Sequence, residues 1–134
     1  MTPFALAHLT DPHLPLPWPP PRLLASKRAL GALNWLRRRR YIHRPEVLAA
    51  LVADLKARAP DHIALTGDLC NISLPEEFRL AARWLESLGS PAEVTVVPGN
   101  HDHYVAIDPA ETLEHWRAFM AGDDGDARFP TLRV

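Results

Sequence analysis

The stretch His62-Ile63-Ala64-Leu65-Thr66-Gly67-Asp68 decides the fold of this chain. Its first five residues form a short, mostly apolar run that predicts a β-strand, and Gly67-Asp68 follows where that strand should end. Two other parts of the chain have the same form: Phe4–Leu9 precedes Asp11-Pro12-His13, and Glu93–Val97 precedes Gly99-Asn100-His101-Asp102. Ligands of α/β proteins bind at the carboxyl ends of parallel strands. The three polar signatures are therefore predicted to share one rim of a sheet.

The segments between these strands predict helices, so the chain is expected to have an α/β fold. Pro45 opens a helix that runs to about Arg58. Ser73 and Glu76 have the spacing of a capping box for a helix that ends before Gly89. A further helix is expected from Asp108 to Gly122. Strands that alternate with helices predict a parallel sheet with helical crossovers.

Two details of the strands follow from their composition. Phe4–Leu9 barely alternates between polar and apolar residues, which predicts a strand buried on both faces. The last residues, Leu132-Arg133-Val134, are typical of the start of another strand. We therefore expect residues 1–134 to be the N-terminal part of one domain of a longer protein.

Composition limits the classes of protein to which the chain can belong. Its 134 residues are 47% hydrophobic and 23% charged, which is typical of a single globular domain. The formal net charge of −1 gives no overall bias toward nucleic acid or anionic surfaces. Cys70 is the only cysteine, no apolar run is long enough to span a bilayer, and no signal peptide is recognisable. A cytoplasmic protein is the expectation.

The segment Pro12–Arg40 is unusual in composition, and its role is left open. Prolines are concentrated between Pro12 and Pro21, where the chain should run extended over the surface. Arg22–Arg40 has helical composition and ends in four consecutive arginines. This basic segment is interpreted first as a solvated helix end. The alternatives are a weak contact with an anionic membrane, a contact with nucleic acid, and a cap over the mouth of the site.

The residue types of the three signatures are those of a divalent-metal site. Alternate side chains of an extended segment point the same way, and Pro12 biases Asp11 toward that conformation, so Asp11 and His13 should reach one ion together. Asp68 has two carboxylate oxygens and can bridge two ions, while Asn100 offers an amide oxygen. Gly67 lets an ion or a phosphate approach the backbone closely.

These ligands suit the hydrolysis of a phosphate ester. Two divalent ions would lower the pKa of a shared water and hold the phosphoryl oxygens, and the resulting hydroxide would attack the phosphorus. His101 is predicted to protonate the leaving oxygen as a general acid. Substrate contacts are expected from Asn100, His101 and His103. Iron, manganese or zinc fits the mixed ligand set better than calcium does.

The three signatures, in this order, resemble the first three blocks of the calcineurin-like metallophosphoesterases. The sequence around them, from His8 to His13, Leu65 to Leu69 and Val97 to Asp102, is most similar to the bacterial branch that includes cyclic-nucleotide phosphodiesterase-like enzymes. The resemblance implies a sandwich of mixed sheets flanked by helices, of which this chain holds the βαβαβα part. It also implies that Asp11 and His13 hold one metal, Asp68 bridges, Asn100 holds the second metal, and His101 donates the proton.

Two departures from the family pattern stand out. Many members carry an aspartate that orients the catalytic histidine at the position of Asn71, which leaves a water or Asp102 as the expected partner. The downstream histidine and the Gly-His-x-His block that complete the metal site are not found after His103. The leading hypothesis is a phosphoesterase that hydrolyses a phosphodiester or a phosphomonoester. Its substrate is left open between cyclic nucleotides, other nucleotides or small phosphate esters, and lipid-linked phosphates. The alternative is a non-catalytic binding scaffold with an incomplete metal site. The oligomeric state stays open.

Overall fold

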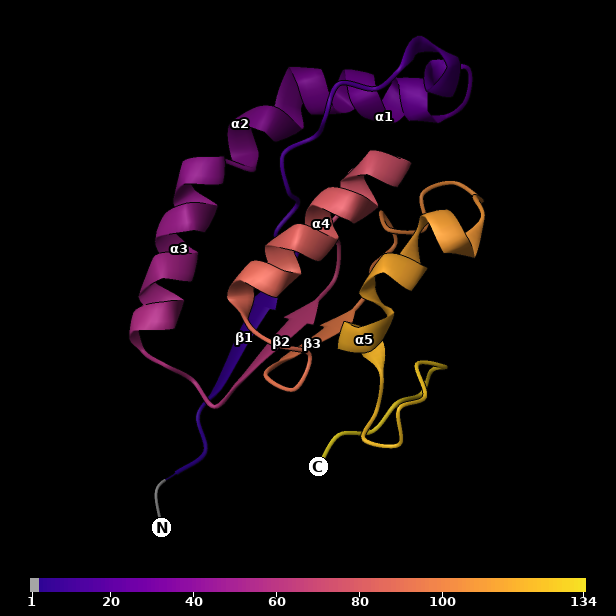
Figure 1. The fold of residues 1–134 in the computed structure, drawn as a ribbon. Coiled ribbons are helices and arrows are strands. Elements are labelled where there is room, and N and C mark those ends of the chain that lie inside the picture. Colours follow the sequence, from indigo (N-terminus) through magenta and orange to yellow (C-terminus); the bar gives the residue numbers. More distant parts are fainter. Residues whose placement is uncertain (1–2) are drawn as a thin grey trace.

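A three-stranded parallel sheet forms the centre of the molecule (Figure 1). The computed structural model describes residues 3–134, apart from the side chain of Leu23. The strands lie in the order β1 (Leu6–Thr10), β2 (His62–Thr66) and β3 (Val94–Val97). The predicted α/β fold with a parallel sheet is confirmed, and all three polar signatures follow strands that end at the same edge.

Helical segments connect the strands, and not all of them lie against the sheet (Figure 1). The two longest are α3 (Pro45–Ala57), which precedes β2, and α4 (Pro75–Leu88), which joins β2 to β3. The basic segment is helical, as its composition predicts. It contains the 3₁₀ turn η1 (Pro21–Leu24), α1 (Arg28–Asn34), the π-helical turn η2 (Trp35–Arg39) and α2 (Arg40–Ile42). In the part of the chain that the structure describes, no helix has the length and apolar character needed to cross a membrane.

The main core lies on one face of the sheet. Leu65 of β2 and Val96 of β3 are completely buried there, and Phe78 and Leu85 of α4 pack against the same cluster. Trp116 closes this core: its ring centroid lies 5.1 Å from that of Phe78, and its indole N–H donates to the Phe78 carbonyl oxygen over 3.0 Å. Because the indole nitrogen has a partner, this large ring is buried without an unpaired polar group.

The expectation that the first strand is buried on both faces is wrong. β1 is an edge strand of the described sheet, and the Leu6 side chain is 60% exposed. On the face away from the core, histidines pair with threonines across the strands. His8 lies 2.7 Å from the Thr66 hydroxyl, and His62 lies 2.8 Å from that of Thr95. Periodicity could not distinguish an edge strand from a central one, because that difference depends on which strands pair.

The predicted capping box at the start of α4 is also wrong. Helix α4 begins after Leu74, and the side chain that reaches back is that of Glu77, whose carboxylate accepts from the Leu74 N–H over 2.9 Å. The same carboxylate accepts from the backbone N–H groups of Asn71 and Ile72. Burial raises the pKa of Glu77, while these N–H donors oppose the shift. Ser73, in the loop after β2, instead forms hydrogen bonds with His101 and Tyr104 in the loop after β3.

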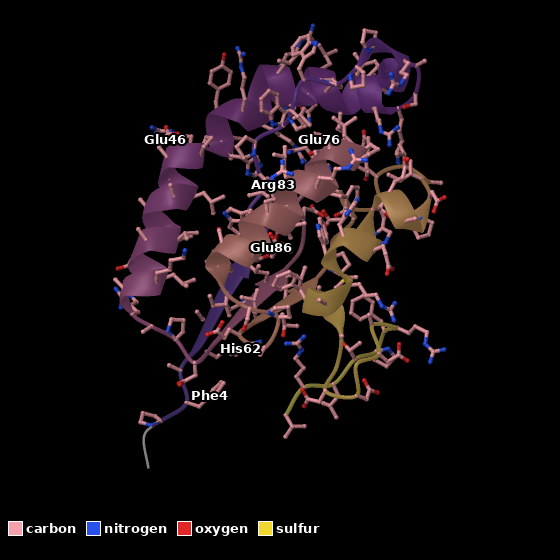
Figure 2. All side chains as sticks on the ribbon, viewed as in Figure 1. Phe4, Glu46, His62, Glu76, Arg83 and Glu86 are labelled. Atoms are coloured by element: carbon pink, nitrogen blue, oxygen red, sulfur yellow. The ribbon has the colours of Figure 1, made fainter. Side chains whose placement is uncertain are left out.

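The outer surface of α4 is charged, in contrast to its buried side. Figure 2 shows Glu76, Arg83 and Glu86 along the solvent side of this helix. Glu76 forms ion pairs with Arg79 and Arg83 at 3.4 and 3.7 Å. Exposed pairs of this kind contribute little to stability, so α4 is held in place mainly by its apolar face.

The helix expected from Asp108 to Gly122 is broken into three short pieces: η3 (Pro109–Glu111), η4 (Leu113–Trp116) and α5 (Arg117–Met120). Asp108 caps the first piece by accepting from the Ala110 N–H, but the backbone of Thr112 leaves the helical region (φ −130°, ψ −112°). Trp116, Phe119 and Met120 are buried in spite of these breaks.

The expected strand at Leu132–Val134 is not formed. The Leu132 carbonyl accepts from the Asp123 N–H, and the Val134 N–H donates to the Asp123 carboxylate. The last residues therefore fold back onto the acidic loop.

Leu85 and Leu30 offer a matched test of where stability resides. Leu85→Ala removes a fully buried side chain from α4 and should lower the free energy of unfolding by about 2–5 kcal/mol. Leu30→Ala on α1 removes a side chain that is 70% exposed and should cost less than about 1 kcal/mol. Urea unfolding followed by circular dichroism measures both. Equal losses would contradict the assignment of the core to the α4 face.

Candidate functional site

The loop after β1 runs alongside the loop after β2 because the parallel hydrogen-bond ladder continues past the strands. The N–H groups of Asp11, His13 and Leu14 donate to the carbonyls of Thr66, Asp68 and Leu69 over 2.9–3.1 Å. Asp11 has φ +50° and His13 has φ +42°. The expectation that Pro12 keeps Asp11 extended is therefore wrong. Aspartate tolerates the left-handed region, and the ladder holds it there.

Asp11, His13 and Asp68 come together as a candidate metal centre. One ligand atom from each of these side chains lies within 4.8 Å of the others. His13 Nε2 is 3.6 Å from Asp68 Oδ2, and His13 Nδ1 is 3.1 Å from the Cys70 carbonyl oxygen, to which it can only donate. This bond assigns the proton to Nδ1 and leaves the Nε2 lone pair facing the carboxylates, the usual arrangement of a metal-binding histidine.

The charges of the centre also suit a cation. Burial lowers the pKa of His13 to about 4, with smaller contributions from His43 and Arg39, so the imidazole is neutral at pH 7. The Thr10 hydroxyl lowers the pKa of Asp11, whose carboxylate is exposed. A neutral imidazole and two carboxylates form a mixed nitrogen–oxygen ligand set.

Two glycines permit the close approach of the three loops. A Cβ atom on Gly67 would lie 2.8 Å from Asp11 Oδ1, and Gly67 has φ +90°. A Cβ atom on Gly99 would lie 2.2 Å from Asp68 Oδ1 and 2.8 Å from the Asp68 backbone nitrogen. Gly67 was expected to make room for an ion or phosphate. In the structure it makes room for the Asp11 carboxylate.

Asp102 joins the loop after β2 to the loop after β3. Its carboxylate accepts from the N–H groups of Leu69 and Cys70 over 3.1 and 2.8 Å, and from the Gly99 N–H over 2.8 Å. The side chain is buried, and burial raises its pKa to about 6 although the backbone N–H donors oppose that shift. The Asp102 carboxylate therefore serves to connect the backbones of these two loops by hydrogen bonds.

His101 lies beside the candidate metal centre. Its backbone N–H donates to Asp68 Oδ1 over 2.7 Å, and its ring stacks on that of Tyr104 at 5.4 Å. Its Nδ1 is 2.6 Å from the carbonyl oxygen of Asn71 and can only donate to it. The group that orients the His101 ring is thus a backbone carbonyl, which any residue type at position 71 would supply. Asp102, one of the two partners expected for His101, instead accepts hydrogen bonds from backbone N–H groups.

The remaining predicted site residues, Asn100 and His103, are exposed on the loop after β3. The Asn100 carbonyl accepts from the His103 N–H, and the His103 ring donates to the Gly99 carbonyl over 3.3 Å. Both contacts are internal to the loop. Their roles toward a metal or a substrate stay predictions.

Two residues at the site were not among the candidates. Arg39 lies 2.9 Å from His101 Nε2 through its Nη2, and the His43 ring centroid lies 4.3 Å from that of His13. Arg39 lies near the end of the basic segment, and His43 follows shortly after it, just beyond α2. The only signal in the sequence was that this segment leaves directly from the Asp11–His13 loop, which suggested a cap over the site.

Comparisons with known proteins show what this chain is similar to. The family model described as calcineurin-like phosphoesterase matches residues 4–130. A probable cyclic nucleotide phosphodiesterase of Synechococcus is 41% identical over 80 residues, which cover 52% of this chain and 31% of that protein. The chain thus matches less than half of that relative's length. No solved structure matches significantly.

Gly99→Ala tests whether the loops must approach as closely as the structure shows. The added Cβ would displace Asp68 from Asp11 and His13, so we expect the affinity for Mn²⁺ to fall about tenfold or more, measured by titration calorimetry. Gly125→Ala is the control, because no atom lies within 4 Å of its Cβ position. It has φ +79°, so it should lower stability slightly and leave Mn²⁺ affinity unchanged. Equal Mn²⁺ affinity in both variants would contradict the proposed packing.

Proposed function

Because the chain belongs to the calcineurin-like phosphoesterase family, we propose that its rim of loops hydrolyses a phosphate ester with the help of divalent metal ions. The observation that supports the proposal most is the convergence of Asp11, His13 and Asp68 within 4.8 Å, directly beside His101. Divalent ions at such a site supply charge neutralisation and an activated water. Manganese, iron or zinc fits the donor atoms, and two ions are proposed.

Different side chains are proposed to hold the metal ions and to transfer the proton. Asp11, His13 and Asp68 would hold the ions, with Asp68 as the shared ligand and Asn100 as a further oxygen donor. The hydrogen bond from His13 Nδ1 to Cys70 keeps the Nε2 lone pair available for this role. Cys70 is completely buried, and burial raises the pKa of its thiol, so it is not a nucleophile.

His101 is proposed to give a proton to the departing oxygen. Its ring is fixed by the bond to the Asn71 carbonyl and by stacking on Tyr104, which leaves Nε2 as the atom that can exchange a proton with substrate. The ring centroid lies 5.3 Å from that of His13, so a phosphate at the candidate metal centre would be next to it. General acids typically contribute about 10²–10⁴-fold.

The substrate class is a phosphodiester or a phosphomonoester. The relative from Synechococcus makes a cyclic nucleotide the first substrate to test. A cytoplasmic location stays a prediction from the sequence.

Asp68→Asn should abolish hydrolysis of bis-p-nitrophenyl phosphate by the Mn²⁺-loaded, full-length protein. The amide cannot supply the second anionic oxygen, and even outer partners of metal ligands cost about 10–100-fold. Asp54→Asn, an exposed carboxylate on α3, is the matched control and should retain full activity. Unchanged turnover in Asp68→Asn would refute the site. Metal content below one equivalent in the wild-type protein would favour the non-catalytic scaffold instead.

His101→Ala should lower kcat by about 10²–10⁴-fold and leave metal content unchanged, since its ring is outside the three-residue metal cluster. Turnover of p-nitrophenyl esters and metal analysis by mass spectrometry provide the two measurements. His115→Ala, an exposed histidine of η4, serves as the control. Loss of metal together with activity would show that His101 acts as a ligand and not as the acid.

A further inference from the structure

The basic segment is fastened over the rim and is not a free helix end. In Figure 1 it lies on the side of the sheet to which the strand arrowheads point. Arg28 of α1 is buried, and its guanidinium donates to the carbonyls of Ile72 and Ser73 over 3.1 and 2.7 Å. A Cβ atom on Gly31 would lie 2.5 Å from the Ile72 side chain. Helix α1 therefore packs directly on the loop after β2.

A second set of contacts ties the segment to the loop after β3. The Lys27 ammonium lies 4.3 Å from the ring centroid of Tyr104, the residue that stacks on His101. The Ser73 hydroxyl donates to the His101 carbonyl and accepts from the Tyr104 N–H, both over 2.8 Å. The site loops and the basic segment thus form one packed unit.

Of the four consecutive arginines, only Arg39 faces the site. Arg37, Arg38 and Arg40 are exposed, whereas Arg39 is half-buried with Nη2 placed 2.9 Å from His101 Nε2. Arg39 belongs to the π-helical turn η2, and π-turns inside α-helices are frequent at functional sites.

Arg39 has no carboxylate partner within ion-pair distance among residues 3–134 that the structure describes. Its hydrogen-bond contacts are with the His101 ring: Nη2 lies 2.9 Å from Nε2, and Nη1 lies 3.4 Å from Nδ1, a nitrogen that already donates to the Asn71 carbonyl. The ring can therefore accept from only one of the five N–H donors of the guanidinium, which has no acceptor of its own. A cation that is half-buried without an anion beside it, at the edge of a candidate phosphoesterase centre, is suited to an anionic ligand. A phosphate group offers several acceptor oxygens and matches the planar fork of arginine.

We propose that Arg39 binds the phosphate group of the substrate and product, so that the inward-facing side of the basic segment, and not its exposed arginines, forms a substrate-binding wall of the site. The proposal rests on the proposed function for its choice of ligand. A phosphoryl oxygen would accept from the guanidinium in place of His101 Nε2, which frees that nitrogen to face the leaving oxygen. His43, beside His13, lies on the same wall.

The proposal distinguishes the inward arginine from its neighbours. A contact with an anionic membrane would use the exposed side chains of Arg37, Arg38 and Arg40, whereas phosphate binding needs Arg39 alone. Arg38→Ala is therefore a matched control for Arg39→Ala, with the same charge removed from the same helical segment.

The test measures binding of inorganic phosphate to the full-length, Mn²⁺-loaded protein by calorimetry, together with KM for bis-p-nitrophenyl phosphate. Arg39→Ala should raise the Kd for phosphate and the KM by about tenfold to a hundredfold, the usual effect of losing a charged hydrogen bond. Arg38→Ala should change both by less than about twofold. Arg39→Lys keeps the charge and should recover part of the affinity.

Three results would overturn the proposal. Equal losses in Arg38→Ala and Arg39→Ala would show a diffuse effect of charge. An unchanged phosphate Kd with a lower kcat would show that Arg39 only positions His101. Loss of pelleting with phosphatidylglycerol vesicles by Arg39→Ala, at unchanged phosphate Kd, would assign Arg39 to a membrane contact.

The calorimetric arm does not depend on turnover. If the wild-type protein hydrolyses no ester but Arg39→Ala, unlike Arg38→Ala, still raises the Kd for phosphate, the proposed function fails and the anion site stands. If Asp68→Asn is inactive and Arg39→Ala binds phosphate normally, the proposed function stands and this inference fails.

Discussion

One buried carboxylate, that of Asp102, holds together the two loops on which the candidate site depends. It accepts from backbone N–H groups on both sides of the junction between the β2 and β3 loops. Asp68 immediately precedes the N–H groups held on one side, and His101 immediately precedes Asp102 itself. The 2.7 Å bond between the His101 N–H and Asp68 follows from this arrangement. A carboxylate was needed because charged acceptors form stronger bonds to several N–H donors than neutral groups do.

The loop after β1 is held at the candidate site by backbone hydrogen bonds, and not by a buried carboxylate. The parallel ladder extends beyond the strands, so that Asp11 and His13 are aligned with the loop after β2 by backbone bonds. Their left-handed backbone then turns both side chains toward Asp68. Gly67 and Gly99 leave the space that this convergence requires, since a methyl group at either position would overlap a carboxylate. Main-chain geometry thus places the three side chains of the candidate metal centre close together.

The basic segment gives the site a wall that the three signatures alone do not provide. Arg28 fastens this segment to the loop after β2, and Arg39 and His43 enter the site from its far end. The guanidinium of Arg39 places a positive charge beside His101. That charge suits a phosphate ester, and it gives the arginine-rich stretch a role that composition alone could not separate from that of a solvated helix end.

The sequence by itself determined the α/β class, the parallel direction of the three strands, helices α3 and α4, and the three signatures that follow the strands at one rim. These features depend on local periodicity and on short motifs, which adjacent residues specify. The tertiary structure alone decided that β1 is an edge strand, that Glu77 caps α4, and that Thr112 interrupts the last helical stretch. It also decided that Asn71 orients His101 through its carbonyl and that Arg39 reaches His101. Each of the site contacts joins residues about 30 to 60 positions apart or depends on a backbone angle set by such a contact, and no local pattern records them.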